Sequence, residues 1–291
     1  MEKAVDSQQS GTEQWVRTYT VDSFADGIAF GQHRLEVGQD PRETYSLRLS
    51  DDSGVMRLRS RYALHKEKPL FELEKHLMRL SRQGVLRSSV IYFGTTTDPF
   101  LPFEGKFDAS MKFLELFQRY TPGILHVQTR SPLIVLALPV FKTLSERVSV
   151  TIGLETPLEE SVQRYTPGLP RVEERLKTAA ALRKFGVEVV LQVSPILPYG
   201  DWRKDAGQFA SLLDQHADYV FVNSNSALGD MSARGTLRDV AKRLAADRKF
   251  HWLRPDASAP LKSELQSIAP QKTILPKRPQ LHDQQISIFA A

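Results

Sequence analysis

Apolar runs of strand length alternate with amphipathic segments of helical period from residue 44 onward. Two of these runs, VSVTIGL and VEVVLQV, are nearly continuous in β-branched or apolar residues, which is typical of parallel strands covered on both faces. The pattern predicts strands at residues 44–49, 89–94, 124–129, 148–154, 187–193 and 219–223. It predicts helices at residues 69–83, 107–120, 132–145, 171–185, 204–215 and 232–247.

This alternation predicts an α/β fold built around a parallel sheet. Six strand–helix units are fewer than the eight of a closed barrel, so we expect a partial (βα)6 TIM-like barrel over residues 44–253. Residues 1–43 are polar with no strong period and predict an N-terminal extension. Residues 254–291 contain five prolines and several basic residues, which predict a flexible C-terminal tail.

Composition narrows the class of protein. The 291 residues include no apolar run long enough to span a bilayer, and the polar start lacks the apolar core of a secretory signal, so we expect a cytoplasmic protein with no membrane association. The formal net charge of +5 is compatible with an acidic partner such as nucleic acid, although solubility explains it equally well.

The chain contains no cysteine. Disulfides, thiolate zinc sites, cysteine nucleophiles and cysteine-held iron-sulfur clusters are therefore excluded. The seven histidines show no zinc-ligand spacing, and phosphate-loop and GxSxG motifs are absent, so we expect no metal site and no catalytic motif of these kinds.

Five segments, in order, resemble the spore photoproduct lyase group of the radical SAM superfamily. They are YFGTTTDPFLPFEGKF at 92–107, VQTRS at 127–131, VSVTIGLE at 148–155, TPGLPRVEERL at 166–176 and VVLQVSPILPYGDW at 189–202. The resemblance covers residues 90–202 and implies a barrel that holds a four-iron four-sulfur cluster and S-adenosylmethionine. In that group the motif CxxxCxxC binds the cluster, and its spacing falls on Ser53, Arg57 and Ser60 in this chain.

Serine and arginine cannot replace thiolates as ligands of such a cluster. The resemblance therefore implies a radical SAM-like pseudoenzyme in which reductive cleavage of S-adenosylmethionine is lost. Two further positions depart from the group, because Arg130 stands where it usually has Lys and Thr166 where it usually has Glu.

The resemblance also implies a cofactor-binding rim at the strand ends. Its residues would be Thr97, Asp98, Arg130, Thr151, Glu155 and Ser194. Their polar side chains could hydrogen-bond a ribose or an amino acid moiety, so binding of S-adenosylmethionine without the cluster stays open. The alternative is structural: Asp98 precedes a proline and would start a turn, and Thr151 would face the sheet.

A basic segment follows the position of the absent cluster motif. Arg57, Arg59 and Arg61 recur at period two and would share one face of an extended strand, with Tyr62 and Lys66 nearby. Guanidinium groups suit phosphates and a tyrosine ring suits base stacking, so this segment predicts DNA binding. A solvated basic edge is the alternative.

Residues 285–289 read QISIF, which resembles the bacterial sliding-clamp-binding pentapeptide. The resemblance assigns clamp contacts to Gln285, Ile286, Ile288 and Phe289, with the glutamine hydrogen-bonding and the apolar side chains filling a pocket. A final strand packed on the barrel is the alternative.

These observations predict a DNA-repair-associated binding protein tethered to the sliding clamp. One alternative is an enzyme that uses the barrel pocket for non-radical chemistry on S-adenosylmethionine or a nucleotide-like ligand, with Asp98, Glu155 and Arg130 as its reactive groups. Another is a structural subunit that pairs with a cluster-bearing paralogue.

Overall fold

The computed structural model describes residues 16–24, 27–35, 63–65, 69–95, 98–100, 106–225, 228 and 236–273. In this part of the chain one sheet has the strand order β3-β2-β1-β4-β5-β6-β7-β8. The strands are β1 Val16–Phe24, β2 Gly27–Leu35, β3 Ala63–His65, β4 Ser89–Phe93, β5 Ile124–Thr129, β6 Val148–Gly153, β7 Glu188–Val193 and β8 Tyr219–Val222.

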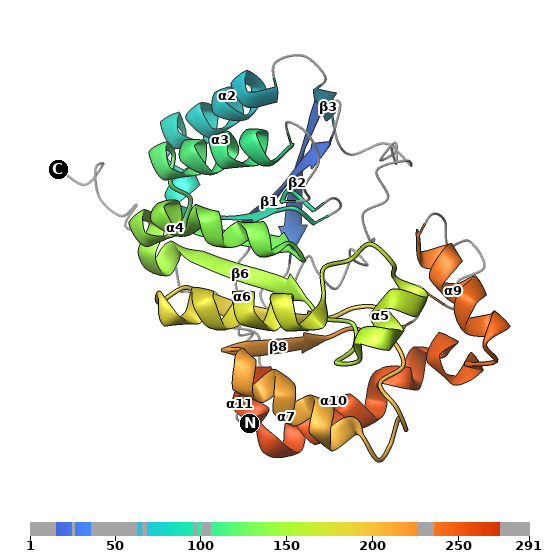
Figure 1. The fold of residues 1–291 in the computed structure, drawn as a ribbon. Coiled ribbons are helices and arrows are strands. Elements are labelled where there is room, and N and C mark those ends of the chain that lie inside the picture. The colour runs from blue at the N-terminus through green and yellow to red at the C-terminus, as the bar shows by residue number, and fades with distance from the viewer. Residues whose placement is uncertain are drawn as a thin grey trace, which may run out of the picture.

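Helices alternate with the strands from β3 onward (Figure 1). They are α2 Pro69–Arg82, α3 Lys106–Arg119, α4 Leu138–Leu144, α5 Glu159–Tyr165, α6 Val172–Lys184, α7 Ala206–His216, α9 Thr236–Ala246, α10 Ala259–Ile268 and α11 Pro270–Thr273. A short 3-10 turn, η4 Phe250–Leu253, lies between α9 and α10. None of these helices is long and apolar enough to cross a membrane.

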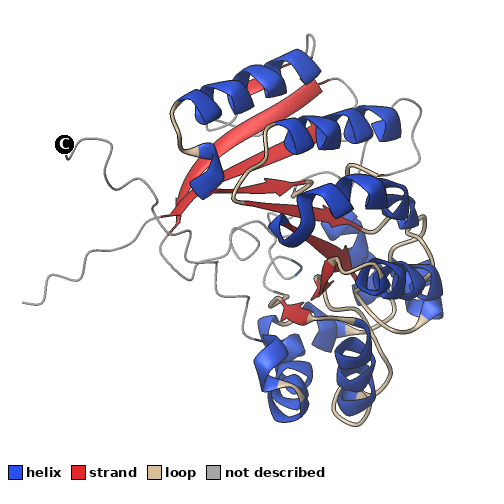
Figure 2. Ribbon diagram, turned by 90° about the vertical axis from the view of Figure 1, so that its left-hand side faces the viewer, coloured by secondary structure: helices blue, strands red, loops and turns tan. Residues whose placement is uncertain are grey.

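The arrangement confirms the predicted α/β partial barrel. Strands β4 to β8 run parallel to their neighbours, and β1 runs parallel to β4. The sheet curves, and helices cover its outer side (Figure 2). Carboxyl ends of parallel strands share one edge of a sheet, so the loops after β4, β5, β6 and β7 meet along one rim.

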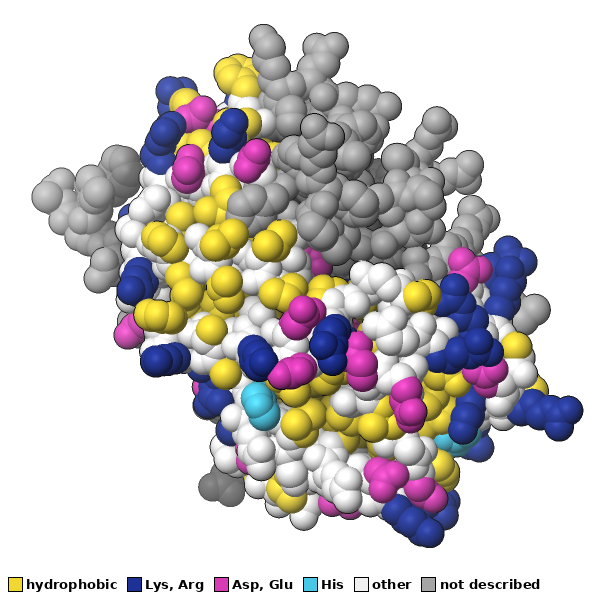
Figure 3. All heavy atoms as spheres, viewed as in Figure 1, with side chains coloured by type: hydrophobic (Ala, Val, Ile, Leu, Met, Phe, Trp, Pro, Cys, Tyr) yellow, Lys and Arg dark blue, Asp and Glu magenta, His cyan; other side chains and the backbone are white. Residues whose placement is uncertain are grey.

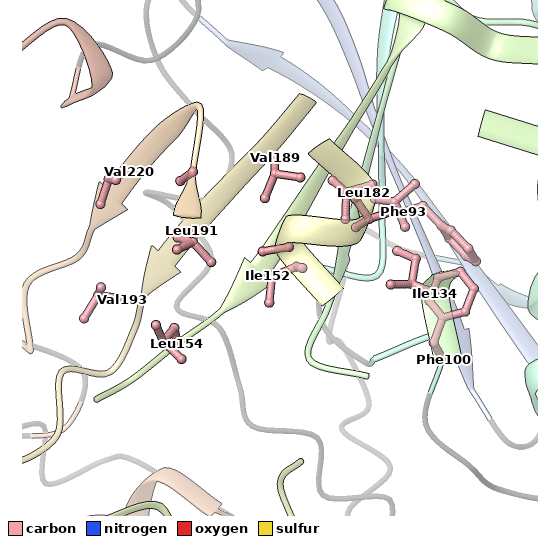
Figure 4. Close-up of a cluster of buried hydrophobic side chains, with 14 of the residues drawn as sticks. Phe93, Phe100, Ile134, Ile152, Leu154, Leu182, Val189, Leu191, Val193 and Val220 are labelled. Atoms are coloured by element: carbon pink, nitrogen blue, oxygen red, sulfur yellow. The ribbon is translucent and has the colours of Figure 1, made fainter. Parts of the chain in front are cut away.

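The main core lies between the sheet and the outer helices. Because side chains alternate along a strand, Ile152 of β6 and Leu191 and Val193 of β7 face the helices (Figure 4). Each such fully buried aliphatic side chain stabilises the fold by about 1.5–3 kcal/mol. The core therefore fixes the register of the strands that carry the rim.

The opposite, inner face of the same strands is polar. Its buried side chains include Tyr92, His126, Gln128, Ser149, Thr151 and Gln192. The Tyr92 and His126 rings stack with their centroids 4.7 Å apart. Apolar runs that suggested strands covered equally on both faces thus have an apolar outer face and a largely polar inner face.

The amino-terminal region differs from the polar extension expected over residues 1–43. Residues 16–35 contribute two strands, and Tyr19 and Val21 of β1 are buried. Polar residues at the next alternate positions, Arg17 and Ser23, hide the period of two. Pairing with both β2 and β4 supplies ladder hydrogen bonds to β1. The strand predicted at 44–49 lies outside the described residues.

The carboxyl-terminal region also differs from the flexible tail expected from residue 254. Helix α10 contacts α7, and its Leu261 and Leu265 are buried one turn apart. Pro260 occupies the first turn of α10 and Pro270 begins α11, positions at which proline is compatible with a helix. These prolines therefore start helices, and the remainder of the predicted tail, 274–291, lies outside the described residues.

Candidate functional site: a buried ionic network at the strand ends

Asp98, in the loop after β4, holds the ends of two strands together. One carboxylate oxygen, Oδ1, accepts hydrogen bonds from the Thr129 hydroxyl at 2.6 Å and from the Phe100 amide at 3.0 Å. The other, Oδ2, accepts one from the Arg130 amide at 2.7 Å. Asp98 is therefore a buried acceptor that fixes the β4 loop to the carboxyl end of β5.

Arg130 continues the network across the rim. Its Nε donates to Glu155 Oε1 at 2.5 Å, and its Nη2 donates to the backbone carbonyl of Ser194 at 3.1 Å. The side chain lies over Gly153, where a Cβ atom would stand 2.9 Å from Arg130 Nε. A glycine at the end of β6 thus leaves the space that lets one arginine link β5, β6 and β7.

Glu155 is completely buried and receives a second arginine from the outer side. Its Oε2 accepts a hydrogen bond from Arg175 Nη1 at 2.6 Å, and the same nitrogen donates to the Gly153 carbonyl at 2.8 Å. Burial alone would raise the pKa of Glu155, but the charges and hydrogen bonds of Arg130 and Arg175 outweigh it and lower the pKa to about 2. The carboxylate is a fixed negative charge near neutral pH and a poor proton acceptor.

Arg175 is a member of the network that sequence reasoning did not assign to the site. It lies on α6, on the same face as Val172, Ala179 and Leu182, which are buried. A charged residue at an apolar-stripe position is the signal that could have identified it. Among the described residues, Arg175 Nε and Nη2 have no hydrogen-bond partner.

The inner face of the sheet adds an uncharged polar layer beside the rim. Gln128 Nε2 of β5 donates to Gln192 Oε1 of β7 at 3.1 Å, so the two amides meet across β6. Within the described part of the chain, Ser149 Oγ and Gln192 Nε2 are buried and have no hydrogen-bond partner. Polar residues at alternate positions of these strands could have indicated this polar layer. Of its residues, only Thr151 was predicted from the sequence.

The structure brings together four of the six predicted rim residues, Asp98, Arg130, Glu155 and Ser194. The Ser194 hydroxyl accepts a hydrogen bond from Asn223 Nδ2 at 3.2 Å, which extends the network to the end of β8. Thr151 is buried within β6 on the inner face, and Thr97 lies outside the described residues. The predicted DNA-contacting residues Arg57, Arg59, Arg61, Tyr62 and Lys66 and the predicted clamp-contacting residues Gln285, Ile286, Ile288 and Phe289 also lie outside them.

The donor atoms of the chain do not fit an iron-sulfur cluster. Such clusters are held by cysteine thiolates, and all 291 residues include none. Within the described ranges, no group of three or more His, Asp or Glu side chains is placed to hold a metal ion. Asp98 and Glu155, the acidic groups of the rim, already accept hydrogen bonds from neighbouring protein groups.

Comparison with solved structures shows that the fold resembles that of spore photoproduct lyases. A spore photoproduct lyase mutant aligns with a TM-score of 0.51 and 11% identity over 74% of this chain and 68% of its own. Another, with bound AdoMet and dinucleoside spore photoproduct, aligns with a TM-score of 0.50 and 11% identity over 72% of this chain and 66% of its own. This chain thus spans about two thirds of the length of these lyases. The sequence matches no protein-family model and no curated protein.

Proposed function

We propose that this chain is a radical SAM-like pseudoenzyme, a DNA-repair-associated protein that binds its partners without radical chemistry. The observation that carries the proposal is a radical SAM fold in a chain that has no cysteine. Without thiolates the cluster that delivers an electron to S-adenosylmethionine has no ligands. The scaffold therefore serves binding.

The ionic network supports this interpretation because it uses the charged rim groups internally. Arg130 and Arg175 neutralise the Glu155 carboxylate, and Asp98 accepts three hydrogen bonds from the chain. These ion pairs and hydrogen bonds hold the loops of the rim in place. A carboxylate that is paired with two arginines is also poorly suited to accept a proton. The rim is thus suited to form a rigid binding surface.

DNA is the ligand that we propose, with the sliding clamp as a second partner. Arg57, Arg59 and Arg61 would contact phosphates, and Tyr62 would stack on a base. The QISIF segment would bind the clamp pocket and hold the barrel near DNA. One lyase of similar fold was solved with a dinucleoside photoproduct, which supports a nucleic-acid ligand for this scaffold.

The inner face supports a second candidate function, binding of S-adenosylmethionine or a nucleotide-like ligand. Ser149 Oγ and Gln192 Nε2 lack partners among the described residues. The Ser149 hydroxyl would donate to or accept from such a ligand, and Gln192 Nε2 would donate to it. Thermal unfolding with and without S-adenosylmethionine or adenosine tests this candidate. A rise in the midpoint that is lost in Gln192→Met supports it, whereas no rise at millimolar ligand removes it.

Pairing with a cluster-bearing paralogue is the remaining alternative. It is distinguished by the size of the purified chain with and without candidate partners. Pairing would give a complex whose cluster belongs to the other chain.

Equilibrium DNA binding tests the main proposal. Fluorescence anisotropy of a labelled oligonucleotide would be measured for the intact chain and for an Arg57, Arg59 and Arg61 triple alanine variant over a range of salt concentrations. We expect micromolar affinity, and we expect the triple variant to reduce the slope of log affinity against log salt by about 2–3. Absence of binding by the intact chain at low salt would exclude DNA as the ligand.

A further inference from the structure

We propose that a surface beside the rim, distinct from residues 57–66, binds single-stranded nucleic acid by combining base stacking with phosphate contacts. This stacking surface consists of Trp202, Arg203, Lys204, Arg248, Lys249, Phe250 and His251. It joins the loop after β7 to the turn between α9 and η4. The inference rests on the proposed function in its class of ligand, but its residues are independent of those named above.

Aromatic contacts join the two parts of the stacking surface. The Trp202 and His251 rings lie with their centroids 4.0 Å apart at an interplanar angle of 31°. The guanidinium carbon of Arg203 lies 4.4 Å from the centroid of the Trp202 ring. Burial and the neighbouring charges of Arg254 and Arg203 lower the pKa of His251, so this ring is uncharged at neutral pH. Trp202 is thus in contact with an aromatic ring from the turn after α9 and with a guanidinium group from its own loop.

Buried hydrogen bonds hold this arrangement against the rim. Asn225 is buried, and its Nδ2 donates to the carbonyls of Ile196 and Trp252, both at 2.8 Å. Its Oδ1 accepts a hydrogen bond from the Ile196 amide at 2.8 Å. The loops after β7 and β8 and the η4 turn are thus fixed to one another, which preorganises the surface for a ligand.

Phe250 supplies an exposed aromatic ring between a cation and a stacked ring. Its exposed fraction is 59%, although Trp252, two residues later, is buried. Lys249 is exposed on one side of it in the sequence and His251 follows on the other. An exposed aromatic ring next to a cation can bind a single strand, because a base stacks on the ring while the cation contacts a phosphate.

Basic residues are concentrated around this turn. Residues 236–254 contain six Lys or Arg and two Asp. Asp247 pairs with Arg164, whose Nε donates a hydrogen bond to Asp247 Oδ2 at 2.8 Å. Because this carboxylate is neutralised, the electrostatic potential near Arg248 and Lys249 is positive. Figure 3 shows Lys and Arg side chains gathered over α9 at the right-hand edge of the view. This charge matches a polyanion.

Arg248 provides an independent indication that the cation itself is used. It ends α9 in a Schellman motif, in which the Lys249 amide donates to the Leu244 carbonyl and the Arg248 amide to the Ala245 carbonyl. The residue at this position has a φ of +56°, which favours glycine. An arginine in this strained conformation points to a role for its side chain.

The stacking groups favour a nucleic acid over other anionic partners. An anionic membrane or an acidic peptide would be attracted by Arg248 and Lys249 but would gain nothing specific from an exposed ring beside a stacked Arg203–Trp202 pair. These partners are therefore separate outcomes of the test.

The test compares two Lys-Phe pairs of the same sequence and different position. Lys249 and Phe250 lie in the stacking surface. Lys184 is the last residue of α6 and Phe185, which is 49% exposed, follows it, at the opposite edge of the sheet. Anisotropy of labelled oligothymidylate would be measured with the intact chain and with each double alanine variant. We expect Lys249→Ala with Phe250→Ala to weaken binding by about tenfold or more, and Lys184→Ala with Phe185→Ala to leave it unchanged.

Arg248→Gly adds a readout that a structural role would not give. It should raise the midpoint of thermal unfolding, because glycine relieves the strained conformation, and yet weaken binding to oligothymidylate and lower the salt slope by about 0.7. Equal effects of the two double variants, or no effect of either, overturn the inference. Loss of binding only in the Arg57, Arg59 and Arg61 variant overturns it while the proposed DNA ligand stands. No binding by the intact chain overturns both, and binding to anionic vesicles that is insensitive to Phe250→Ala assigns the surface to a membrane instead.

Discussion

The carboxylate of Glu155 and the guanidinium of Arg175 are both fully buried and lie 2.6 Å apart, with the acid on the β6 loop and the base on α6. A second arginine, Arg130, contacts the other carboxylate oxygen from the β5 side. The barrel therefore has an ionic junction at the carboxyl edge of its strands, which is the edge where barrel enzymes have their active sites. Removing Glu155 would leave two guanidinium groups in the interior without their counter-charge.

Glu155→Gln tests this junction. Two buried guanidinium groups would lose their counter-charge, so the free energy of unfolding should fall by about 3–5 kcal/mol. Urea unfolding at neutral pH measures it. Glu160→Gln, which removes an exposed carboxylate at the start of α5, is the control and should change stability by less than about 0.5 kcal/mol. A similar small change in both variants would contradict the structural role of the junction.

The acid sensitivity of the protein should depend on the same group. The folded-state pKa of Glu155 is about 2, below its ordinary value of 4.5, so its contribution to stability is complete above about pH 4.5 and is lost as the pH falls towards 2. Urea midpoints between pH 2 and pH 6, compared between the native chain and Glu155→Gln, measure the difference. We expect the gap between the two curves to close on acidification within that window, and parallel curves would show that Glu155 does not titrate in this way.

The Arg130 side chain lies against Gly153, so a larger residue at position 153 should destabilise the protein. Gly153→Ala would place a methyl group 2.9 Å from Arg130 Nε, and because Glu155 holds that side chain, the cost should be about 1–3 kcal/mol. Gly207→Ala on α7 is the matched control, since its nearest contact is an ordinary 3.6 Å and alanine favours a helix. Opposite signs of the two changes in unfolding free energy are expected, and stabilisation by Gly153→Ala would refute the packing described.

The positions of strands β4 to β8 could be predicted from the sequence. Their side chains that face the helices are apolar and either recur with period two or belong to an uninterrupted apolar run. Strand β1 could not be predicted, since its polar residues hide the buried Tyr19 and Val21 and its place depends on pairing with β2 and β4. Prolines misled the interpretation of residues 254–273 because proline marks helix starts as well as tails.

The rim was predicted in outline, but its chemistry was not. The resemblance to the lyase group assigned Asp98, Arg130, Glu155 and Ser194 to the strand ends, where parallel strands bring side chains together. Arg175 neutralises Glu155 only because of the way in which α6 packs on the sheet. The position of Arg175 along its helix does not identify Glu155 as its partner from the sequence alone. Gln128 and Gln192 meet only because β5 and β7 flank β6.

Clamp binding by the QISIF segment is a further prediction. A Gln285→Ala and Phe289→Ala double variant should lose capture by immobilised bacterial sliding clamp, because one loses the amide and the other the apolar anchor. A variant with Ser287→Ala alone is the control and should be captured like the native chain. Equal capture of native chain and double variant would remove the clamp as a partner.

Anaerobic reconstitution tests the central claim most directly. The purified chain would be incubated with ferrous iron, sulfide, a strong reductant and S-adenosylmethionine, and bound iron, the low-temperature spin signal and released deoxyadenosine would be measured. The absence of thiolates predicts no stoichiometric cluster and no cleavage of S-adenosylmethionine. A brown protein with one cluster per chain that releases deoxyadenosine would contradict the account.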